Sequence, residues 1–142
     1  MNQYASETVD ESSIVELRIP PEAEWAAVAR LTVAAIASRL DFSLDDIDDV
    51  KLAVAEACTH AIQRATGEHP IELVFEARAD SIVVTVRDSS TAAHLESVED
   101  DVDENHIGGL GLFIIRSLMD EVDFRVDPRV GGELTMLKRV TG

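Results

Sequence analysis

The order in which strand-like and helical patterns follow one another is the strongest constraint on the fold of this chain. Strict alternation of apolar and polar residues is typical of half-buried strands, whereas apolar residues spaced three or four apart are typical of helices. By these criteria the chain has the order β-α-α-β-β-loop-α-β-β. The predicted strands are residues 14–19, 71–77, 81–87, 122–127 and 134–140, and the predicted helices are residues 22–40, 43–66 and the stretch "GLFIIRSLMDEV" (111–122).

The fold class follows from this order. The strands 71–77 and 81–87 are joined by a short turn around Ala79–Asp80, which implies an antiparallel pair. We therefore predict an α+β fold, a two-layer α/β sandwich with helices on one face of a mixed, mostly antiparallel sheet. We expect residues 1–12 to be a disordered tail and residues 13–142 to be a single domain.

Charge and cysteine content limit the ligands and the compartment. The net charge of −16 would repel nucleic-acid phosphates, so it suits a partner with a basic surface or simply keeps the protein soluble. The single cysteine, Cys58, cannot form an internal disulfide, and we expect it to be a small buried hydrophobe in a reducing compartment. No signal-peptide pattern and no apolar run of roughly 20 residues occurs, so we expect a soluble cytoplasmic protein without a membrane segment.

The second predicted helix, residues 43–66, carries polar residues that could have a chemical role. Ser43 and Asp46 form a variant of the capping box at the start of the second helix. We expect Glu56, His60 and Gln63 to lie opposite its apolar face. Glu56 could act as a general base, or Glu56 and His60 could hold a metal or form a solvated pair. The apolar stripe predicted for the first helix is Trp25, Val28, Thr32, Ile36 and Leu40, and that of the second is Val50, Val54, Cys58 and Ala61.

Two further stretches could bind a ligand. Glycines directly before a helix leave backbone N–H groups free for a phosphate, so "IGGLGLFIIRSL" is either an anion site or a flexible hinge. Asp88 ends the strand 81–87, where it could accept a hydrogen bond from an amino group such as that of adenine, or form a local turn. The segment 88–107 is acidic and aperiodic, and such a long loop is typically functional or disordered.

In combination, these stretches resemble the anti-sigma factors with serine-protein kinase activity, the RsbW and SpoIIAB type, of the GHKL (histidine kinase-like) ATPase superfamily. The resemblance runs from Ile14 to Lys138 and is closest at "RLTVAAIASRLDFSLDDIDDVKLAVAEACT" and "GGLGLFIIRSLMDEV". It implies ATP and Mg²⁺ as cofactors and a homodimer formed through the sheet. It also implies a role in transcription regulation and stress response by partner switching, between a sigma factor and an anti-anti-sigma protein of the STAS fold.

The resemblance implies roles for individual residues. Glu56, on the helix that carries the N-box, would be the general base for phosphoryl transfer. Asp88 would hold the adenine amino group, and Arg30 would contact partner proteins. The positions implied to lie around the nucleotide are His60, Arg64, Gly108, Gly109, Leu110, Gly111 and Leu112.

The N-box helix departs from the family pattern at two positions. His60 stands where the family has an asparagine whose oxygen ligates Mg²⁺. An imidazole nitrogen is a poor replacement because Mg²⁺ prefers oxygen ligands. One turn later, Arg64 stands where the family has a histidine.

The segments around the adenine position depart as well. Ser89 and Ser90 follow Asp88 where the family has glycine. Glu133, with Thr135 as the alternative on the same side, stands at the position of a threonine near the adenine. We therefore predict an anti-sigma-type binding module with a degenerate ATP site; the alternative is an active ATP-dependent serine-protein kinase that phosphorylates a STAS antagonist.

Overall fold

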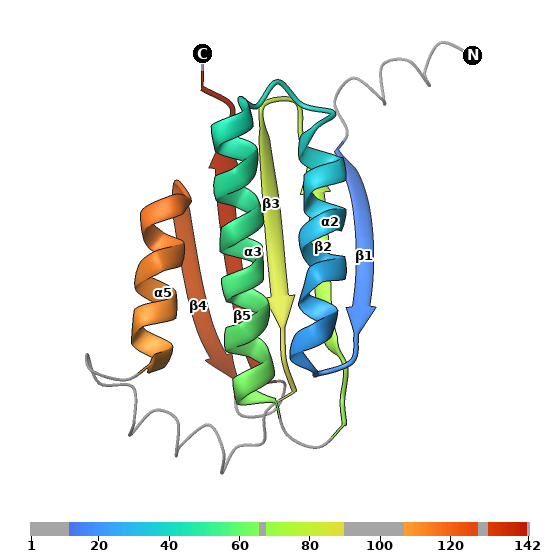
Figure 1. Cartoon of the computed structure of the whole chain (residues 1–142), viewed down its shortest axis with the longest axis vertical. Coiled ribbons are helices and arrows are strands. Elements are labelled where there is room, and N and C mark those ends of the chain that lie inside the picture. Colours follow the sequence, from blue (N-terminus) through green and yellow to red (C-terminus); the bar gives the residue numbers. More distant parts are fainter. Residues whose placement is uncertain (1–11, 66–67, 90–106, 128–130, 142) are drawn as a thin grey trace.

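The computed structural model describes residues 12–65, 68–89, 107–127 and 131–141, and these form the predicted order of strands and helices (Figure 1). The predicted tail, except Ser12, and most of the segment 88–107 lie outside the described residues. The elements are β1 (Ser13–Ile19), the 3₁₀ turn η1 (Ala23–Trp25), α2 (Ala26–Ala37), α3 (Leu44–Arg64), β2 (Ile71–Ala77), β3 (Ser81–Arg87), α5 (Ile107–Leu118), β4 (Glu121–Asp127) and β5 (Gly131–Arg139).

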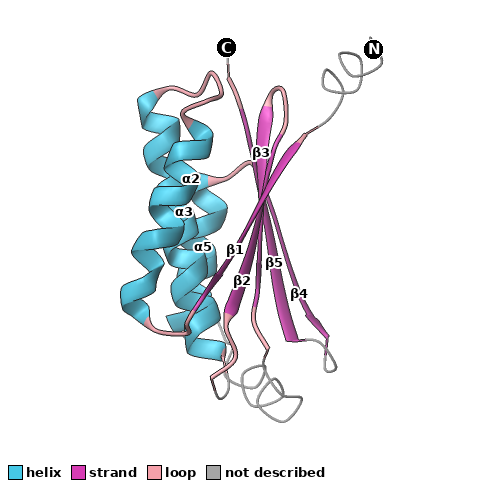
Figure 2. Ribbon diagram, turned by 90° about the vertical axis from the view of Figure 1, so that its right-hand side faces the viewer, coloured by secondary structure: helices cyan, strands magenta, loops and turns pink. Residues whose placement is uncertain are grey.

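The five described strands form one open sheet in the order β1-β2-β3-β5-β4. Every strand pair in it is antiparallel, so the part of the sheet that the structure describes is antiparallel rather than mixed. Helices α2, α3 and α5 cover one face of the sheet and leave the other face uncovered (Figure 2). The predicted α+β, two-layer class is therefore confirmed.

Alternation along the strands builds the core between the two layers. In β2 and β3 the residues that face the helices are large aliphatic or aromatic side chains, and the intervening ones are partly exposed. Cys58 of α3 is fully buried in this core, as predicted, and burial raises the pKa of its thiol to about 12. The buried residues of β2 and β3 are Ile71, Leu73, Phe75, Ile82, Val84 and Val86.

The prediction for the apolar stripe of the first helix was wrong in part. Trp25 and Val28 are 40% and 37% exposed, whereas the residues of α2 that are fully buried are Ala29, Val33 and Ala37. These small side chains let α2 lie close to its neighbours, which places the larger residues at its outer side. The outer side of α2 is therefore more apolar than the sequence pattern predicts.

Candidate functional site

Helix α3 is the central helix of its layer, flanked by α2 and α5 (Figure 1). Its start is fixed by Ser43, whose hydroxyl accepts a hydrogen bond from the Asp46 N–H at 3.1 Å, as the predicted capping box requires. Because neighbours cover α3 on two sides and the sheet covers a third, the buried arc of this helix is wide. His60 and Arg64, two polar residues in its last two turns, are therefore enclosed, whereas Thr59 and Gln63 remain exposed.

His60 is buried, which contradicts its predicted place on an exposed face with Glu56 and Gln63. Only 8% of the residue is exposed, whereas Gln63 is exposed and Glu56 is intermediate. The edge of the imidazole meets the Phe124 ring of β4, with the ring centroids 5.2 Å apart and the planes at 84°. Burial and then the nearby Arg64 charge lower the pKa of His60 to about 4, with the Asp88 carboxylate opposing the shift, so the ring is neutral at pH 7.

Arg64, at the end of α3, and Asp88, just after β3, form a buried ion pair. Arg64 Nε donates to Asp88 Oδ2 at 3.3 Å, and the two side chains are 4% and 3% exposed. The guanidinium carbon lies 5.0 Å from the centroid of the Phe124 ring. On the other oxygen, the Gly132 N–H donates to Asp88 Oδ1 at 3.1 Å. Both carboxylate oxygens of Asp88 thus accept a hydrogen bond from the chain itself.

The two glycines that begin β5 make this arrangement sterically possible. Gly131 has a φ of +112°, and a Cβ there would lie 2.1 Å from the Asp88 carbonyl oxygen. A Cβ on Gly132 would lie 2.7 Å from Asp88 Oδ2 and 3.1 Å from Arg64 Nε. The Gly131 and Gly132 backbone therefore closes tightly around the ion pair. A Gly-Gly pair at the start of a strand is the signal in the sequence that could have indicated such a close approach.

Helix α5 (Ile107–Leu118) begins and ends four residues earlier than the predicted helix over 111–122. It starts at Ile107, which places Gly108, Gly109 and Gly111 within the helix. Glycine is tolerated there because its cost relative to alanine is about 1 kcal/mol, which the packing of the later apolar residues offsets. Leu110 is 59% exposed and Leu112 is 9% exposed, so the two predicted leucines point in different directions.

Glu56 lies next to the beginning of α5. A Cβ added to Gly111 would be 3.7 Å from Glu56 Oε1, so the carboxylate faces the helix backbone at this point. The first turn of a helix has backbone N–H groups without acceptors inside the helix. Glu56 therefore lies beside the second turn of α5, one turn after these N–H groups.

The other predicted residues lie away from this cluster. Arg30 is exposed on α2. Glu133 forms an ion pair with Arg87 at 2.7 Å, and the alternation of buried and exposed residues along β5 places Glu133 and Thr135 on the face opposite Leu134. Because Leu134 faces the helices, Glu133 and Thr135 lie on the face of the sheet that the helices leave uncovered, and their place near an adenine stays a prediction.

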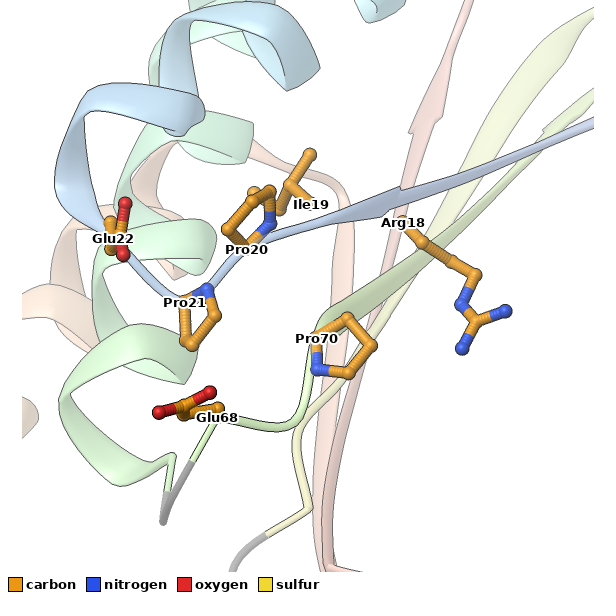
Figure 3. Close-up of a pocket in the computed structure, with 7 residues that line it drawn as sticks. All are labelled: Arg18, Ile19, Pro20, Pro21, Glu22, Glu68 and Pro70. Carbon is orange, nitrogen blue, oxygen red and sulfur yellow. The ribbon is translucent and has the colours of Figure 1, made fainter.

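A pocket of about 760 Å³ lies outside the cluster, where β1 leads into η1 (Figure 3). Three prolines, which have no N–H to donate, line it. The carboxylates of Glu22 and Glu68 come to it from two segments and would repel a phosphate, and the lining cation, Arg18, lies 3.9 Å from the Glu72 carboxylate. This pocket contains none of the predicted site residues and does not have the chemistry of a nucleotide site.

The described side chains do not fit a bound adenine nucleotide with Mg²⁺ as they stand. An adenine amino group needs an accessible acceptor on Asp88, and this side chain is only 3% exposed, with Arg64 and Gly132 donating to its two oxygens. Mg²⁺ prefers oxygen ligands, and His60 offers a buried nitrogen. The part of the chain that the structure describes contains no group of three or more His, Cys, Asp or Glu side chains arranged to hold a metal.

The sequence analysis did not find Phe124 or the Arg64–Asp88 pair. Arg64 and Asp88 are 24 residues apart, and no local pattern links them. Phe124 has the alternation of an ordinary strand residue, so nothing in the sequence distinguishes it from the core.

The described helices also include none that is long and apolar enough to cross a membrane.

Over most of its length the chain is similar to proteins of one known family. The model of the histidine kinase-like ATPase domain matches residues 19–138. The serine-protein kinase RsbW of Bacillus licheniformis is 38% identical over 133 residues, which cover 85% of this chain and 83% of that protein. The RsbW of Staphylococcus aureus is 37% identical over 134 residues (85% and 84%), and that of Bacillus subtilis strain 168 is 34% identical over 140 residues (90% and 86%).

Proposed function

Because the chain belongs to the histidine kinase-like ATPase family and to its RsbW serine-protein kinase group, we propose that it is an anti-sigma-type regulator. In this proposal it binds a sigma factor and/or a STAS-domain anti-anti-sigma protein by partner switching in the cytoplasm. ATP and Mg²⁺ are expected for the family, and we propose that their site is degenerate in this chain. A homodimer formed through the uncovered face of the sheet is part of the same proposal.

The outer side of η1 and α2 is the observation that supports partner binding most directly. Trp25, Val28 and Leu31 are 40%, 37% and 63% exposed, and they follow one another at a spacing of three residues beside the exposed Arg30. Aromatic residues and arginine are enriched at protein interfaces, and exposed apolar patches mark them. The net charge of −16 favours a partner whose contacting surface is basic.

The test is binding of purified sigma factors and STAS proteins from the same organism to the chain and its surface variants. Arg30→Glu and Leu31→Asp are expected to weaken binding of the true partner at least tenfold without changing the midpoint of unfolding. Arg39→Glu is the matched control, because Arg39 is also exposed but lies beyond the end of α2. The proposal fails if none of these proteins binds, or if the variants bind as tightly as the unchanged chain. Sedimentation of the chain alone tests the homodimer separately.

The degenerate site is supported by the chemistry of two residues. His60 is buried and neutral, and it offers no oxygen to Mg²⁺. Ser89 follows Asp88 where a glycine would let the backbone lie close to a base. The test is a calorimetric titration of the unchanged chain with Mg-ATP, in which micromolar affinity would refute degeneracy.

A second candidate, an active serine-protein kinase, is supported by the position of Glu56. Its carboxylate lies beside the first turns of α5, where it could take the proton of a substrate hydroxyl as a general base. The test is transfer of labelled phosphate from ATP to a STAS protein, compared with a Glu56→Gln variant. Transfer that depends on Glu56 would favour the kinase over the binding module.

A further inference from the structure

We propose that Arg64 is a built-in occupant of the base site: its guanidinium takes the place on Asp88 that a nucleobase amino group would take. The site is then closed by the chain itself and opens only when Arg64 leaves. This inference rests on the proposed function, because it takes from it the assignment of Asp88 to the base.

The first step of the argument is the occupancy of the Asp88 carboxylate. Oδ2 accepts from Arg64 Nε at 3.3 Å, and Oδ1 accepts from the Gly132 N–H at 3.1 Å. The backbone also ties the two segments together, since the Asp88 N–H donates to the Gly132 carbonyl at 3.0 Å. Each oxygen could accept a second bond, but the Asp88 side chain is only 3% exposed and lies against Arg64, so a base that approached it would have to displace Arg64.

The second step is that the displacement is unfavourable. Arg64 and Asp88 carry opposite charges, whereas the amino group of a base is neutral and would leave the buried carboxylate without its cation. The guanidinium would also have to leave an enclosure in which its side chain is only 4% exposed. A base that binds Asp88 thus exchanges a stronger contact for a weaker one, and its affinity falls by about tenfold or more.

The third step is that the surroundings are shaped to hold Arg64. Phe124 of β4 offers its ring face 5.0 Å from the guanidinium carbon. Gly132 has no side chain at the point where a Cβ would lie 3.1 Å from Arg64 Nε. Strands β4 and β5, both distant along the chain from Arg64, therefore form a fitted enclosure for its guanidinium. This enclosure distinguishes Arg64 from a surface arginine that meets an acid by chance.

The experiment is a calorimetric titration with ADP, without Mg²⁺, so that the chemistry of His60 does not enter. The variants are Arg64→His, which carries the residue that the family has at this position, and Arg64→Gln, whose amide nitrogen reaches as far as Arg64 Nε but which lacks the rest of the guanidinium and its charge. Arg78→Gln is the matched control, because Arg78 pairs with the carboxylate of Glu76 at the partly exposed surface. Circular dichroism establishes that each variant is folded.

We expect both Arg64 variants to bind ADP at least tenfold more tightly than the unchanged chain, and the Arg78→Gln control to bind as the unchanged chain does. Adding Asp88→Asn to Arg64→His is expected to abolish the gain, since the acceptor for the base is then replaced by an amide. A gain that survives Asp88→Asn would overturn the proposal, because the nucleotide would then bind elsewhere.

The other outcomes separate this proposal from the proposed function. Micromolar binding of ADP by the unchanged chain overturns the built-in occupant whether or not the variants fold, and it leaves the assignment of Asp88 intact. Absence of ADP binding in every folded variant overturns both the occupant and the assignment of Asp88 to a base. Neither result touches the binding of sigma or STAS partners, which is measured separately on the α2 surface.

Discussion

Removing the charge of Arg64 while Asp88 stays in place is expected to cost the protein a large part of its stability. In an Arg64→Met variant the Asp88 carboxylate, with its side chain 3% exposed, would keep the Gly132 N–H donor but lose the Arg64 cation. Breaking a buried pair by removing one partner costs about 3–5 kcal/mol. For a domain of this size the corresponding fall in melting temperature is on the order of 10 °C.

Removing both charges together is expected to cost far less. In Arg64→Met/Asp88→Asn, the Asn amide oxygen can still accept from the Gly132 N–H, and the methionine can pack against the Phe124 ring. Replacing a buried ion pair with groups of similar volume is often nearly neutral. The double variant should therefore lie within about 2 kcal/mol of the unchanged chain, which leaves a coupling energy of at least about 1 kcal/mol even where Asp88→Asn alone costs nothing.

Urea unfolding followed by circular dichroism measures all the corners of this cycle. Arg78→Met is the control, because the Arg78 and Glu76 side chains are 46% and 29% exposed and such a pair is worth at most about 1 kcal/mol. If Arg64→Met loses no more than Arg78→Met, or if the two changes at the buried pair are additive, the reasoning from an enclosed ion pair is refuted.

Three further outcomes are expected. The pKa of His60 is lowered from 6.5 to about 4 in the folded chain, so on acidification the imidazole of the unfolded chain is protonated first. The free energy of unfolding should therefore fall as the pH drops from about 6.5 to 4, by at most about 3 kcal/mol. His60→Gln should flatten this pH dependence, measured as midpoints of urea unfolding. Gly132→Ala should lower the free energy of unfolding by about 1–3 kcal/mol, since its Cβ would lie 2.7 Å from Asp88 Oδ2; an unchanged midpoint would contradict the close approach. The buried Cys58 thiol, whose pKa burial raises to about 12, should react with a thiol reagent only after unfolding, and rapid labelling of the folded chain would contradict its burial.

The fold could be predicted because its elements carry local signals. The bounds of β2 and β3, 71–77 and 81–87, agree with the predicted strands residue for residue, since alternation and a short turn fix both the strands and their pairing. The start of α3 agrees for a similar reason, as the Ser43 cap is a local hydrogen bond. The start of α5 was misplaced because glycine in a sequence indicates a break, whereas the packing of Leu112 and Ile115 extends the helix.

The sequence could predict which residues belong to the candidate site, but not which of them contact one another. Periodicity placed His60 on a polar face because it counts polarity on one helix and does not include the neighbours, α5 and β4, that cover it. The Arg64–Asp88 pair depends on how the end of α3 meets the end of β3, which is a tertiary property. Residue propensity and spacing do not predict this contact between the end of α3 and the end of β3 until the order of the strands in the sheet is known.

The ion pair also bears on how such a regulator could be controlled. A ligand that binds only the folded state stabilises it by an amount that grows with ligand concentration. Here Arg64, a residue of the same chain, makes the contact with Asp88 that a ligand would otherwise make. The stabilisation of the folded state by this contact therefore does not depend on the concentration of a ligand. The exposed side of α2 faces away from α3, whose end carries Arg64. With a site closed in this way, the α2 surface has no nucleotide signal to respond to. Release of one partner would then depend on competition from another for the chain.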